Sequence, residues 1–335
     1  MKITIRDVAR EAGVSISTVS YALNKVGELT KPTHKRVLEA AERLGYVPDP
    51  TARSLVMGTT NSIGIVIPPN STFDLDNPYT LQMLSSLSRL LSDINYWMSV
   101  SIPQSVEEQS TKHFLVNSKI DGLIWLESPL PKYVSKVMLQ RRLPCIDIGY
   151  GKNINATILV EDDEGIKQAI DYLYSLGHKR IMFISGYEDE EDNSRLLAYN
   201  ERMSELGVSY HQVIVGDFNE KATYNAILDF LSKTKKGSLP TAILAASDLM
   251  AIGVLKALDK LSIKVPEEMS VMGFDDIPAA SDTYPPLTTM KQPIDFIMRT
   301  ACEHIFASIK GEDVPLNYKI FTKLIVRKST AYIKS

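Results

Sequence analysis

Cysteines and long apolar runs are scarce in this chain of 335 residues. Its two cysteines, Cys145 and Cys302, lie far apart without a CxxC spacing, which argues against a disulfide framework and a cysteine metal site. No segment approaches the roughly 18 apolar residues of a membrane helix, and the N-terminus has no apolar stretch typical of a signal peptide. We therefore expect a cytoplasmic protein without membrane contact, in which both cysteines are buried.

Signatures of phosphate binding and catalysis are missing as well. The sequence has no GxGxxG after a strand, no GxxxxGKS/T loop, no HExxH and no GxSxG. Asp275 and Asp276 resemble paired acids, but no partner motif accompanies them, and His178, next to Lys179 before a strand, more simply packs or caps. We expect no enzymatic activity, no cofactor and no metal, and a sugar-modifying enzyme is a remote alternative.

What the sequence does contain is an ordinary globular composition with unevenly distributed charge. With 44% hydrophobic and 23% charged residues the chain is able to bury a core, and its length predicts two or three folding units. Residues 1–58 carry nine Lys or Arg and six Asp or Glu, whereas the remainder has a net charge of -6. A mildly basic head on an acidic body is expected when one end alone contacts nucleic-acid phosphates.

The start of the head predicts two short helices. Thr4 and Asp7 have the spacing of a capping box, and Gly13 ends the first helix. Ser15 is placed to cap a second helix from Ile16 to Asn24. The apolar positions of this second helix must face inward, which leaves four side chains outside: Ile16, Ser17, Ser20 and Tyr21.

A third helix is predicted after Thr30, which is placed to cap it, with Pro32 in the first turn and Gly45 as the stop. The first two helices, joined by Ala12–Ser15, form a helix-turn-helix whose second helix starts with small polar residues that fit a DNA major groove. The plainer alternative is a small helical domain that binds another protein.

Three motifs of the head resemble the headpiece of the lactose-repressor/galactose-repressor (LacI/GalR) family. They are DVAREAGVSISTVS at 7–20, LGYVP at 44–48 and ARSL at 52–55. Further family motifs extend the resemblance over nearly the whole chain: LGHKRI at 176–181, GDF at 216–218, SD at 247–248, GFDDI at 273–277 and PLTT at 286–289. The resemblance implies a sequence-specific DNA-binding transcriptional regulator, most simply a repressor, and makes a protein-binding head a remote alternative.

For the head, the resemblance implies three kinds of DNA contact. Base edges are read by Ile16, Ser17 and Tyr21. Tyr21 departs from the basic residue or histidine of some members, so their half-site cannot be transferred. Phosphates are contacted, or helices capped, by Thr4, Ser15, Thr18, Ser20 and Asn24. A hinge at 50–57 also contacts DNA through Arg53 and inserts Leu55 into the minor groove, with a solvated charge and linker packing as the respective alternatives.

Beyond residue 58, short apolar segments alternate with helical ones and predict an α/β body with two doubly wound parallel sheets. The strand candidates are Ser62–Ile67, Trp97–Ile102, Gly122–Leu126, Pro144–Ile148, Arg180–Ser185, Val213–Val215, Ala242–Ala246 and Ser270–Phe274. Ligands of such sheets bind beyond the carboxyl ends of the strands, so the loops after these segments are expected to line a cleft between two lobes.

The resemblance assigns an effector site to this cleft. It implies that Arg195 and Asp275 clamp the effector, that Phe218 stacks on it and that Ser247 lines the pocket. Asn77 and Tyr79, after the first strand, complete the candidate set. The alternatives are a structural ion pair for the Arg195 and Asp275 clamp, a core position for Phe218, and for Asp248 the role of a helix cap.

The nature of the effector stays open in the sequence. An arginine, a carboxylate and an aromatic ring suit a sugar, whereas a purine or nucleoside, or a phosphoprotein corepressor that docks outside the cleft, are the alternatives. Ser247 stands where several family members have Asn, and Glu161-Asp162 replaces a frequent Asp-Asn pair. Induction and corepression both remain open.

The resemblance also implies how the chain is divided and assembled. A headpiece and hinge at 1–58 precede an effector-binding and dimerisation domain at 59–335. Its N-lobe is expected at about 60–160 and 291–321 and its C-lobe at about 161–290 and 322–335, with closure around ligand as the switch. Without a heptad pattern to build a tetramer, we expect a homodimer on pseudo-palindromic double-stranded operator DNA. A sugar-binding transport component, the last alternative, would need export and no head.

Overall fold

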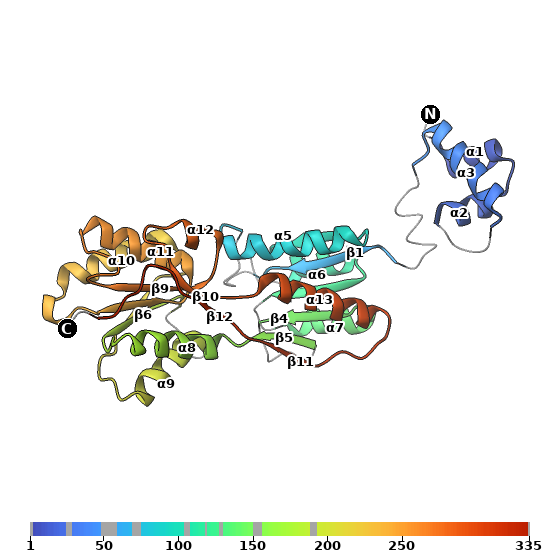
Figure 1. Ribbon diagram of the computed structural model, residues 1–335. Coiled ribbons are helices and arrows are strands. Elements are labelled where there is room, and N and C mark those ends of the chain that lie inside the picture. The colour runs from blue at the N-terminus through green and yellow to red at the C-terminus, as the bar shows by residue number, and fades with distance from the viewer. Residues whose placement is uncertain are drawn as a thin grey trace.

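The computed structural model consists of a small helical head and a larger body built on two sheets (Figure 1). It describes residues 3–24, 29–47, 59–68, 75–103, 108–117, 119–126, 130–149, 156–187 and 193–333. The predicted hinge, with Arg53 and Leu55, lies outside the described residues. Among the helices of the described part, none has the length and apolar character needed to cross a membrane.

The head contains the three predicted helices, α1 (Ile5–Ala12), α2 (Ile16–Asn24) and α3 (Lys31–Leu44). Gly13 and Gly45 end α1 and α3 in the left-handed conformation, at φ 64° and 63°, which glycine adopts without steric cost. The buried residues of the shared core are valines and alanines: Val8, Ala9, Ala12, Val19, Ala22, Val37, Ala40 and Ala41. Larger, partly buried side chains such as Leu23 and Leu44 pack around them. Apolar periodicity therefore identified these helices correctly.

Two of the three predicted caps form as expected. The Asp7 carboxylate accepts hydrogen bonds from the backbone N–H and the hydroxyl of Thr4, at 3.0 and 2.7 Å. The Ser15 hydroxyl accepts from the backbone N–H of Thr18 at 3.1 Å. Thr30 differs, because its side chain bonds no backbone N–H and instead meets the Thr33 hydroxyl at 2.9 Å. A neighbouring hydroxyl has here replaced the backbone donor as its partner.

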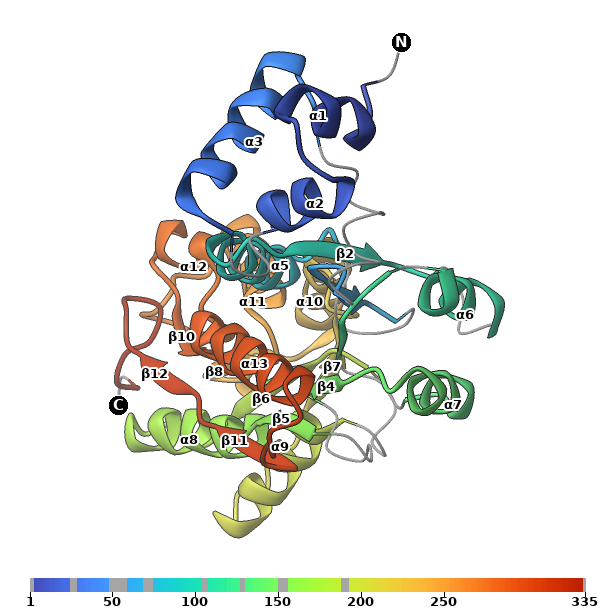
Figure 2. The same cartoon turned by 90° about the vertical axis from the view of Figure 1, so that its right-hand side faces the viewer.

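The body is formed by two six-stranded sheets with the same spatial strand order. The first sheet, in the order β11-β5-β4-β3-β1-β2, and the helices that pack on it are called the N-lobe. Its strands are β1 (Ser62–Val66), β2 (Trp97–Ser101), β3 (Gly122–Leu126), β4 (Cys145–Ile148), β5 (Ala156–Val160) and β11 (Asn317–Ile320), and its helices are α5 (Pro78–Asp93), α6 (Glu108–Asn117), α7 (Lys132–Arg141) and α13 (Ile294–Ile309). Helices α5 and α13 lie side by side (Figure 2).

The second sheet, in the order β12-β10-β9-β8-β6-β7, and its helices are called the C-lobe. Its strands are β6 (Ile181–Ser185), β7 (Val213–Val215), β8 (Ala242–Ala245), β9 (Ser270–Asp275), β10 (Thr288–Lys291) and β12 (Lys323–Ile325). Its helices are α8 (Asp162–Ser175), α9 (Ser194–Glu205), α10 (Glu220–Lys233), α11 (Asp248–Lys260) and α12 (Pro278–Asp282). All strand pairs are parallel except β10 with β12.

All eight predicted strands are present to within a residue at either end. Strands β1, β3, β4, β6, β8 and β9 are buried along their whole length, as expected for parallel strands covered on both faces. Strands β5, β10, β11 and β12 are present in addition to those that the apolar pattern predicts. The chain passes between the sheets at three points, near Glu161, at Gln292 and Pro293, and at Phe321 and Thr322.

Candidate effector site and DNA-binding surface

Arg195, in the first turn of α9, lies among polar groups at the carboxyl ends of the C-lobe strands. Its guanidinium donates to the Asp162 carboxylate, with Nε and Nη2 at 2.9 and 2.7 Å from Oδ2, and also to the carbonyl oxygen of Ala246. Nη2 lies 3.8 Å from Oδ1 of Asp275, and the guanidinium stacks 4.2 Å from the ring centre of Phe274. Arg195 and Asp275, which the sequence predicts to act together, therefore lie close to each other, but Arg195 is closer to Asp162 than to Asp275.

Asp162 is the first residue of α8 and follows the crossover from the N-lobe. Burial raises the pKa of its carboxyl group, and the charge and hydrogen bonds of Arg195 oppose that rise. Its Oδ1 atom is buried and has no hydrogen-bond partner in the described part of the chain. One oxygen of this carboxylate thus holds Arg195, and the other retains its capacity to accept a hydrogen bond.

Asp275 and Asp276 form a strained turn at the end of β9. Both have positive φ angles, 115° and 61°, a conformation that costs a non-glycine residue of the order of 1–3 kcal/mol. Oδ1 of Asp275 accepts from Nε2 of Gln292 at 2.6 Å. Asp276 forms ion pairs with Arg327 and Lys291, at 2.6 and 3.2 Å. Partners on both sides therefore hold the turn in place.

Asp248 supports the same turn from beneath. Its buried carboxylate accepts from the backbone N–H of Ile277 at 2.9 Å and from the Thr289 hydroxyl at 2.6 Å. Burial, and next the charge of Asp275, raise the pKa of Asp248 well above its ordinary value. Ser247, not Asp248, caps α11 by accepting from the Met250 N–H at 3.3 Å. As expected, Asp248 orders a loop. Its partners, however, are Ile277 after β9 and Thr289 in β10, and not the N-terminus of α11.

Phe218 lies just after β7 and packs flat on the backbone of the neighbouring loop. A Cβ at Gly186 would overlap the Phe218 ring, so only glycine permits this approach. The ring also meets Tyr187 edge-on, with centroids 5.1 Å apart. Phe218 is half-buried and has a left-handed φ of 46°. This position leaves part of the ring accessible at the carboxyl edge of the sheet.

Asn77 and Tyr79 belong to the start of α5 in the N-lobe. The Asn77 side chain caps this helix by accepting from the backbone N–H of Tyr79 at 3.0 Å. The buried Tyr79 hydroxyl donates to Oε1 of Gln292 at 2.7 Å. Since the amide of Gln292 donates to Asp275, one chain of hydrogen bonds joins the N-lobe to the strained turn.

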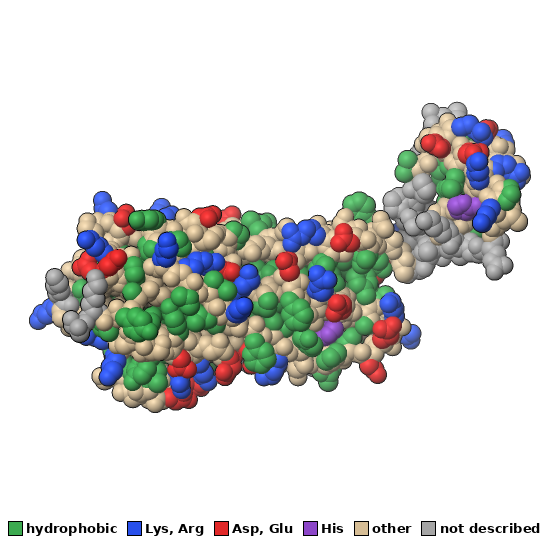
Figure 3. Space-filling model, viewed as in Figure 1, with side chains coloured by type: hydrophobic (Ala, Val, Ile, Leu, Met, Phe, Trp, Pro, Cys, Tyr) green, Lys and Arg blue, Asp and Glu red, His purple; other side chains and the backbone are tan. Residues whose placement is uncertain are grey.

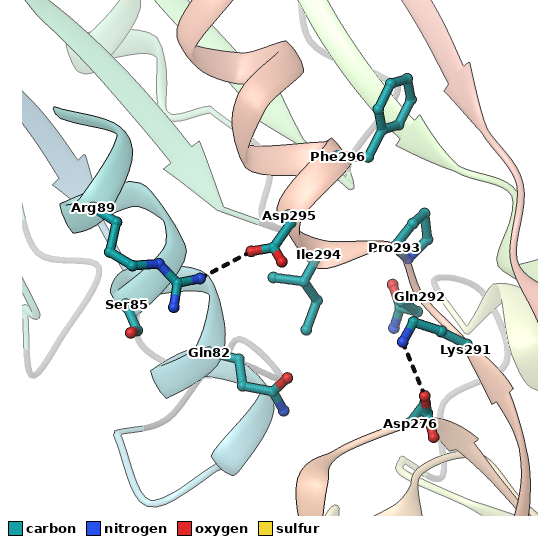
Figure 4. Close-up of a pocket in the computed structure, with 10 residues that line it drawn as sticks. All are labelled: Gln82, Ser85, Arg89, Asp276, Lys291, Gln292, Pro293, Ile294, Asp295 and Phe296. Atoms are coloured by element: carbon teal, nitrogen blue, oxygen red, sulfur yellow. Dashed lines mark hydrogen bonds and ion pairs between the residues drawn. The ribbon is translucent and has the colours of Figure 1, made fainter. Parts of the chain in front are cut away.

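A hollow of about 410 Å³ lies between α5 and the crossover into α13 (Figure 4). Gln82, Ser85 and Arg89 of α5 face it from one side, and the segment Lys291–Phe296 faces it from the other, together with Asp276. Arg89 pairs with Asp295 and Lys291 pairs with Asp276, at 3.1 and 3.2 Å. None of the six predicted effector residues lines this hollow, although Gln292 does.

Sequence reasoning left three residues out of the effector set that the structure places at or beside it. From the sequence, Asp162 is a departure from the family pattern, Gln292 lies next to the predicted boundary between the lobes at 290–291, and Asp248 is a candidate cap. A polar residue within a crossover is the one signal that would have identified Gln292, because crossovers pass the cleft. Among the described residues, no group of three or more His, Cys, Asp or Glu is arranged to hold a metal ion.

In the head, Ile16, Ser17 and Tyr21 are exposed on α2, whereas Val19 and Ala22 on the opposite face are buried. Other residues predicted to contact DNA form hydrogen bonds with their neighbours in the chain. The Ser15 hydroxyl lies 2.8 Å from the hydroxyls of Ser17 and Thr18, and the Asn24 side chain donates to the Ser20 hydroxyl at 3.3 Å. Thr4 is exposed beside the cap of α1. Lys and Arg side chains are frequent on the face of the head seen in Figure 3.

Two family models match the chain, that of the lacI family of bacterial regulatory proteins over residues 4–49 and that of a periplasmic binding protein-like domain over residues 170–330. The HTH-type transcriptional repressor PurR of Histophilus somni (strain 2336) is 31% identical and aligns with 97% of this chain and 98% of its own length.

Solved structures match the same architecture. The lac repressor dimer bound to operator and the anti-inducer ONPF superposes with a TM-score of 0.85 at 24% identity, over 99% of this chain and 100% of its own. The transcriptional regulator CelR in complex with cellobiose gives a TM-score of 0.70 at 26% identity, over 98% and 100%. The chain belongs to the lacI family of bacterial regulatory proteins and is a DNA-binding transcriptional regulator with an effector-binding body, not an enzyme.

Proposed function

We propose that this regulator is a repressor whose operator affinity is controlled by a sugar bound between the two lobes. The observation that carries the proposal is the position of Arg195, which lies with Asp162 and Asp275 where the carboxyl ends of β6, β8 and β9 meet. Guanidinium and carboxylate groups hydrogen-bond adjacent hydroxyls, and the accessible part of the Phe218 ring offers an apolar face to a sugar ring. Ser247, Asn77 and Tyr79 complete the proposed site.

The head is proposed to read the operator through the exposed face of α2. Ile16 suits a thymine methyl group, Ser17 is able to donate or accept, and Tyr21 carries both an apolar ring and a hydroxyl. Phosphate contacts or caps are assigned to Thr4, Ser15, Thr18, Ser20 and Asn24, and contacts of the hinge to Arg53 and Leu55. A homodimer would place two such heads on a pseudo-palindromic site.

The link between effector and operator is proposed to pass through the lobe angle. Tyr79, Gln292 and Asp275 join both lobes beside the site, so a ligand held by Asp275 acts on groups that bridge the crossover. By linkage, the effector changes operator affinity by the same factor by which the operator changes effector affinity. The corresponding coupling free energy is typically ~1–3 kcal/mol.

A purine or nucleoside is the second candidate effector, and the observation that favours it is the aromatic pair at the edge of the C-lobe sheet. Tyr187 and Phe218 meet edge-on with centroids 5.1 Å apart, and the accessible part of either ring offers an apolar face on which a planar base stacks. The two candidates differ in what they require of Phe218, since a base gains more from the ring face than a sugar does.

The test is selection of a binding site from randomised double-stranded DNA at fixed salt, followed by titration of the complex with neutral sugars and nucleosides. We expect a short pseudo-palindrome whose affinity changes with one compound, and we expect Arg195→Gln to abolish that change. Arg202→Gln is the matched control, because Arg202 also pairs with carboxylates but lies in the last turn of α9, whereas Arg195 lies in the first. Specific DNA binding that no compound alters would instead indicate a protein corepressor.

A further inference from the structure

We infer that Asp162 makes the effector site selective against negatively charged ligands, so that the effector is an uncharged, hydroxyl-bearing molecule and not a phosphorylated or carboxylated one. This inference rests on the proposed effector site and names the chemical class that the site accepts. The juxtaposition behind it is that of one guanidinium, Arg195, with two carboxylates, Asp162 and Asp275.

The first argument is that Arg195 is already neutralised. Oδ2 of Asp162 accepts from two guanidinium nitrogens of Arg195 at 2.9 and 2.7 Å, and only 12% of the Arg195 side chain and 14% of the Asp162 side chain are exposed. A phosphate or carboxylate ligand would have to displace Asp162 from Arg195 and leave that carboxylate buried without its cation. Removing one partner of a buried ion pair in this way is strongly unfavourable.

The groups around Arg195 carry more negative than positive charge. Arg195 carries one positive charge against the two negative charges of Asp162 and Asp275. Arg327 and Lys291 exceed the charge of Asp276 by one, but both bind Asp276 itself, at 2.6 and 3.2 Å, and not Asp162 or Asp275. Like charges repel strongly in partly buried surroundings, so an anion that approaches Arg195 meets repulsion from the two carboxylates beside it.

The helix that carries Asp162, α8, has acidic residues in its first turn. A helix N-terminus ordinarily attracts anions through its free N–H groups and dipole. The first turn of α8 instead contains Asp162, Asp163 and Glu164, and Glu161 directly precedes it. These carboxylates occupy the favourable position themselves, so the N-terminus of α8 offers no attraction to an anionic ligand.

The last argument is the unused hydrogen-bonding capacity of Asp162. Its buried Oδ1 accepts no hydrogen bond in the described part of the chain, and a buried carboxylate oxygen gains from a donor. A hydroxyl group supplies such a donor, whereas a phosphate dianion does not. Asp162 therefore favours an uncharged polyol as well as excluding anions.

The decisive experiment measures the binding of inorganic phosphate to the full-length protein, by calorimetry and by thermal unfolding, in three versions. They are the wild type, Asp162→Asn and the matched control Asp171→Asn. Asp171 is an exposed carboxylate on the same helix as Asp162, and its substitution releases the half-buried Arg202 of α9 from a 2.8 Å ion pair. Phosphate stabilises most proteins through exclusion from their surface, and the comparison with Asp171→Asn removes that general effect.

We expect Asp162→Asn to bind phosphate roughly tenfold or more tightly than the wild type and the control, because one negative charge next to Arg195 is removed. Equal phosphate binding by all three proteins would overturn the inference. So would stabilisation of the wild type by ribose 5-phosphate or adenosine 5′-phosphate that is absent in Arg195→Gln, a result that does not depend on whether Asp162→Asn folds. Failure of the proposed site looks different, since a neutral effector would then bind Arg195→Gln and wild type equally.

Discussion

The two lobes have the same strand order. A carboxylate that accepts from backbone N–H groups, however, lies at the amino end of the strands in the N-lobe and at their carboxyl end in the C-lobe. In the N-lobe, Asp121 precedes β3 and accepts from the backbone N–H groups of Thr60 and Asn61, at 2.7 and 2.8 Å, and from the Thr60 hydroxyl at 2.8 Å. In the C-lobe, Asp248 follows β8 and fixes Ile277 and Thr289 beside the strained turn.

The difference shows which end of each lobe must be rigid. Asp121 fixes the first described residues after the head, where β1 begins. Asp248 fixes the turn that presents Asp275, at the end where we place the effector. The same topology is thus stiffened on the DNA side in one lobe and on the ligand side in the other.

The largest effect is expected from Asp248→Ala. The substitution leaves the buried N–H of Ile277 and the buried Thr289 hydroxyl without their acceptor, at a cost of about 4 kcal/mol in the free energy of unfolding. Urea denaturation measures the loss, and effector affinity falls with it because the Asp275 turn is released. Asp171→Ala, at an exposed ion pair, is the control and should cost less than about 1 kcal/mol. Similar losses in both variants would contradict the assignment.

Asp121→Ala tests the other side of the comparison. Three donors around Thr60 lose a partly buried acceptor, which we expect to cost about 2 kcal/mol of stability. Operator affinity should fall while the affinity for effector stays unchanged, the reverse of the pattern expected for Asp248→Ala. Fluorescence titrations with operator and with effector separate the two. A loss of effector affinity alone would break the division between the lobes.

Gln292→Leu removes the joint between the lobes with little change in volume. It leaves the Tyr79 hydroxyl and the Asp275 carboxylate each without one partner, and we expect a loss of about 1–2 kcal/mol. The more telling result is the ratio of operator affinities with and without effector, which should approach one. Tyr79→Phe removes only one of the two bonds and should reduce the ratio less. An unchanged ratio in Gln292→Leu would exclude this bridge from the coupling.

The smallest expected effect is a loss of stability at mildly acidic pH, to which His178 of the C-lobe contributes more than His304 of the N-lobe. Burial lowers the pKa of His178, which contacts Thr241 and the Ala331 carbonyl at 3.1 and 3.0 Å. The unfolded chain then binds a proton more readily than the folded one. Stability from this group is therefore present above the ordinary pKa of 6.5 and is lost as the pH falls below it, by at most about 1.4 kcal/mol per pH unit.

His178→Gln should remove that slope in thermal unfolding between mildly acidic and neutral pH. The N-lobe counterpart is His304, whose pKa burial also lowers, but this side chain is only half-buried. Replacement of His304 should remove a smaller share of the slope. A larger share for His304 would show that the N-lobe, not the C-lobe, carries the acid sensitivity.

Six of the eight strands that the sequence predicted are buried along their whole length and mostly apolar, such as β1 and β6, whereas β2 and β7 are partly exposed edge strands. Of the missed strands, β11 and β12 lie at sheet edges and expose several residues, but β5 and β10 lie inside the sheets and are mostly buried. In the site, family motifs led to Arg195 and Asp275, and their proximity followed from the shared carboxyl edge of the sheet. The roles of Asp162 and Gln292 depend on segments brought together only by the crossovers, which local pattern does not reveal.

The core of the head, whose buried side chains are valines and alanines, has a consequence for how such a regulator evolves. The side chains that we propose to read bases, Ile16, Ser17 and Tyr21, contribute nothing to that core. We therefore expect substitutions at these three positions to alter the preferred operator with little penalty in folding. A duplicated gene is thereby free to acquire new target promoters one base preference at a time, while its effector response is inherited intact.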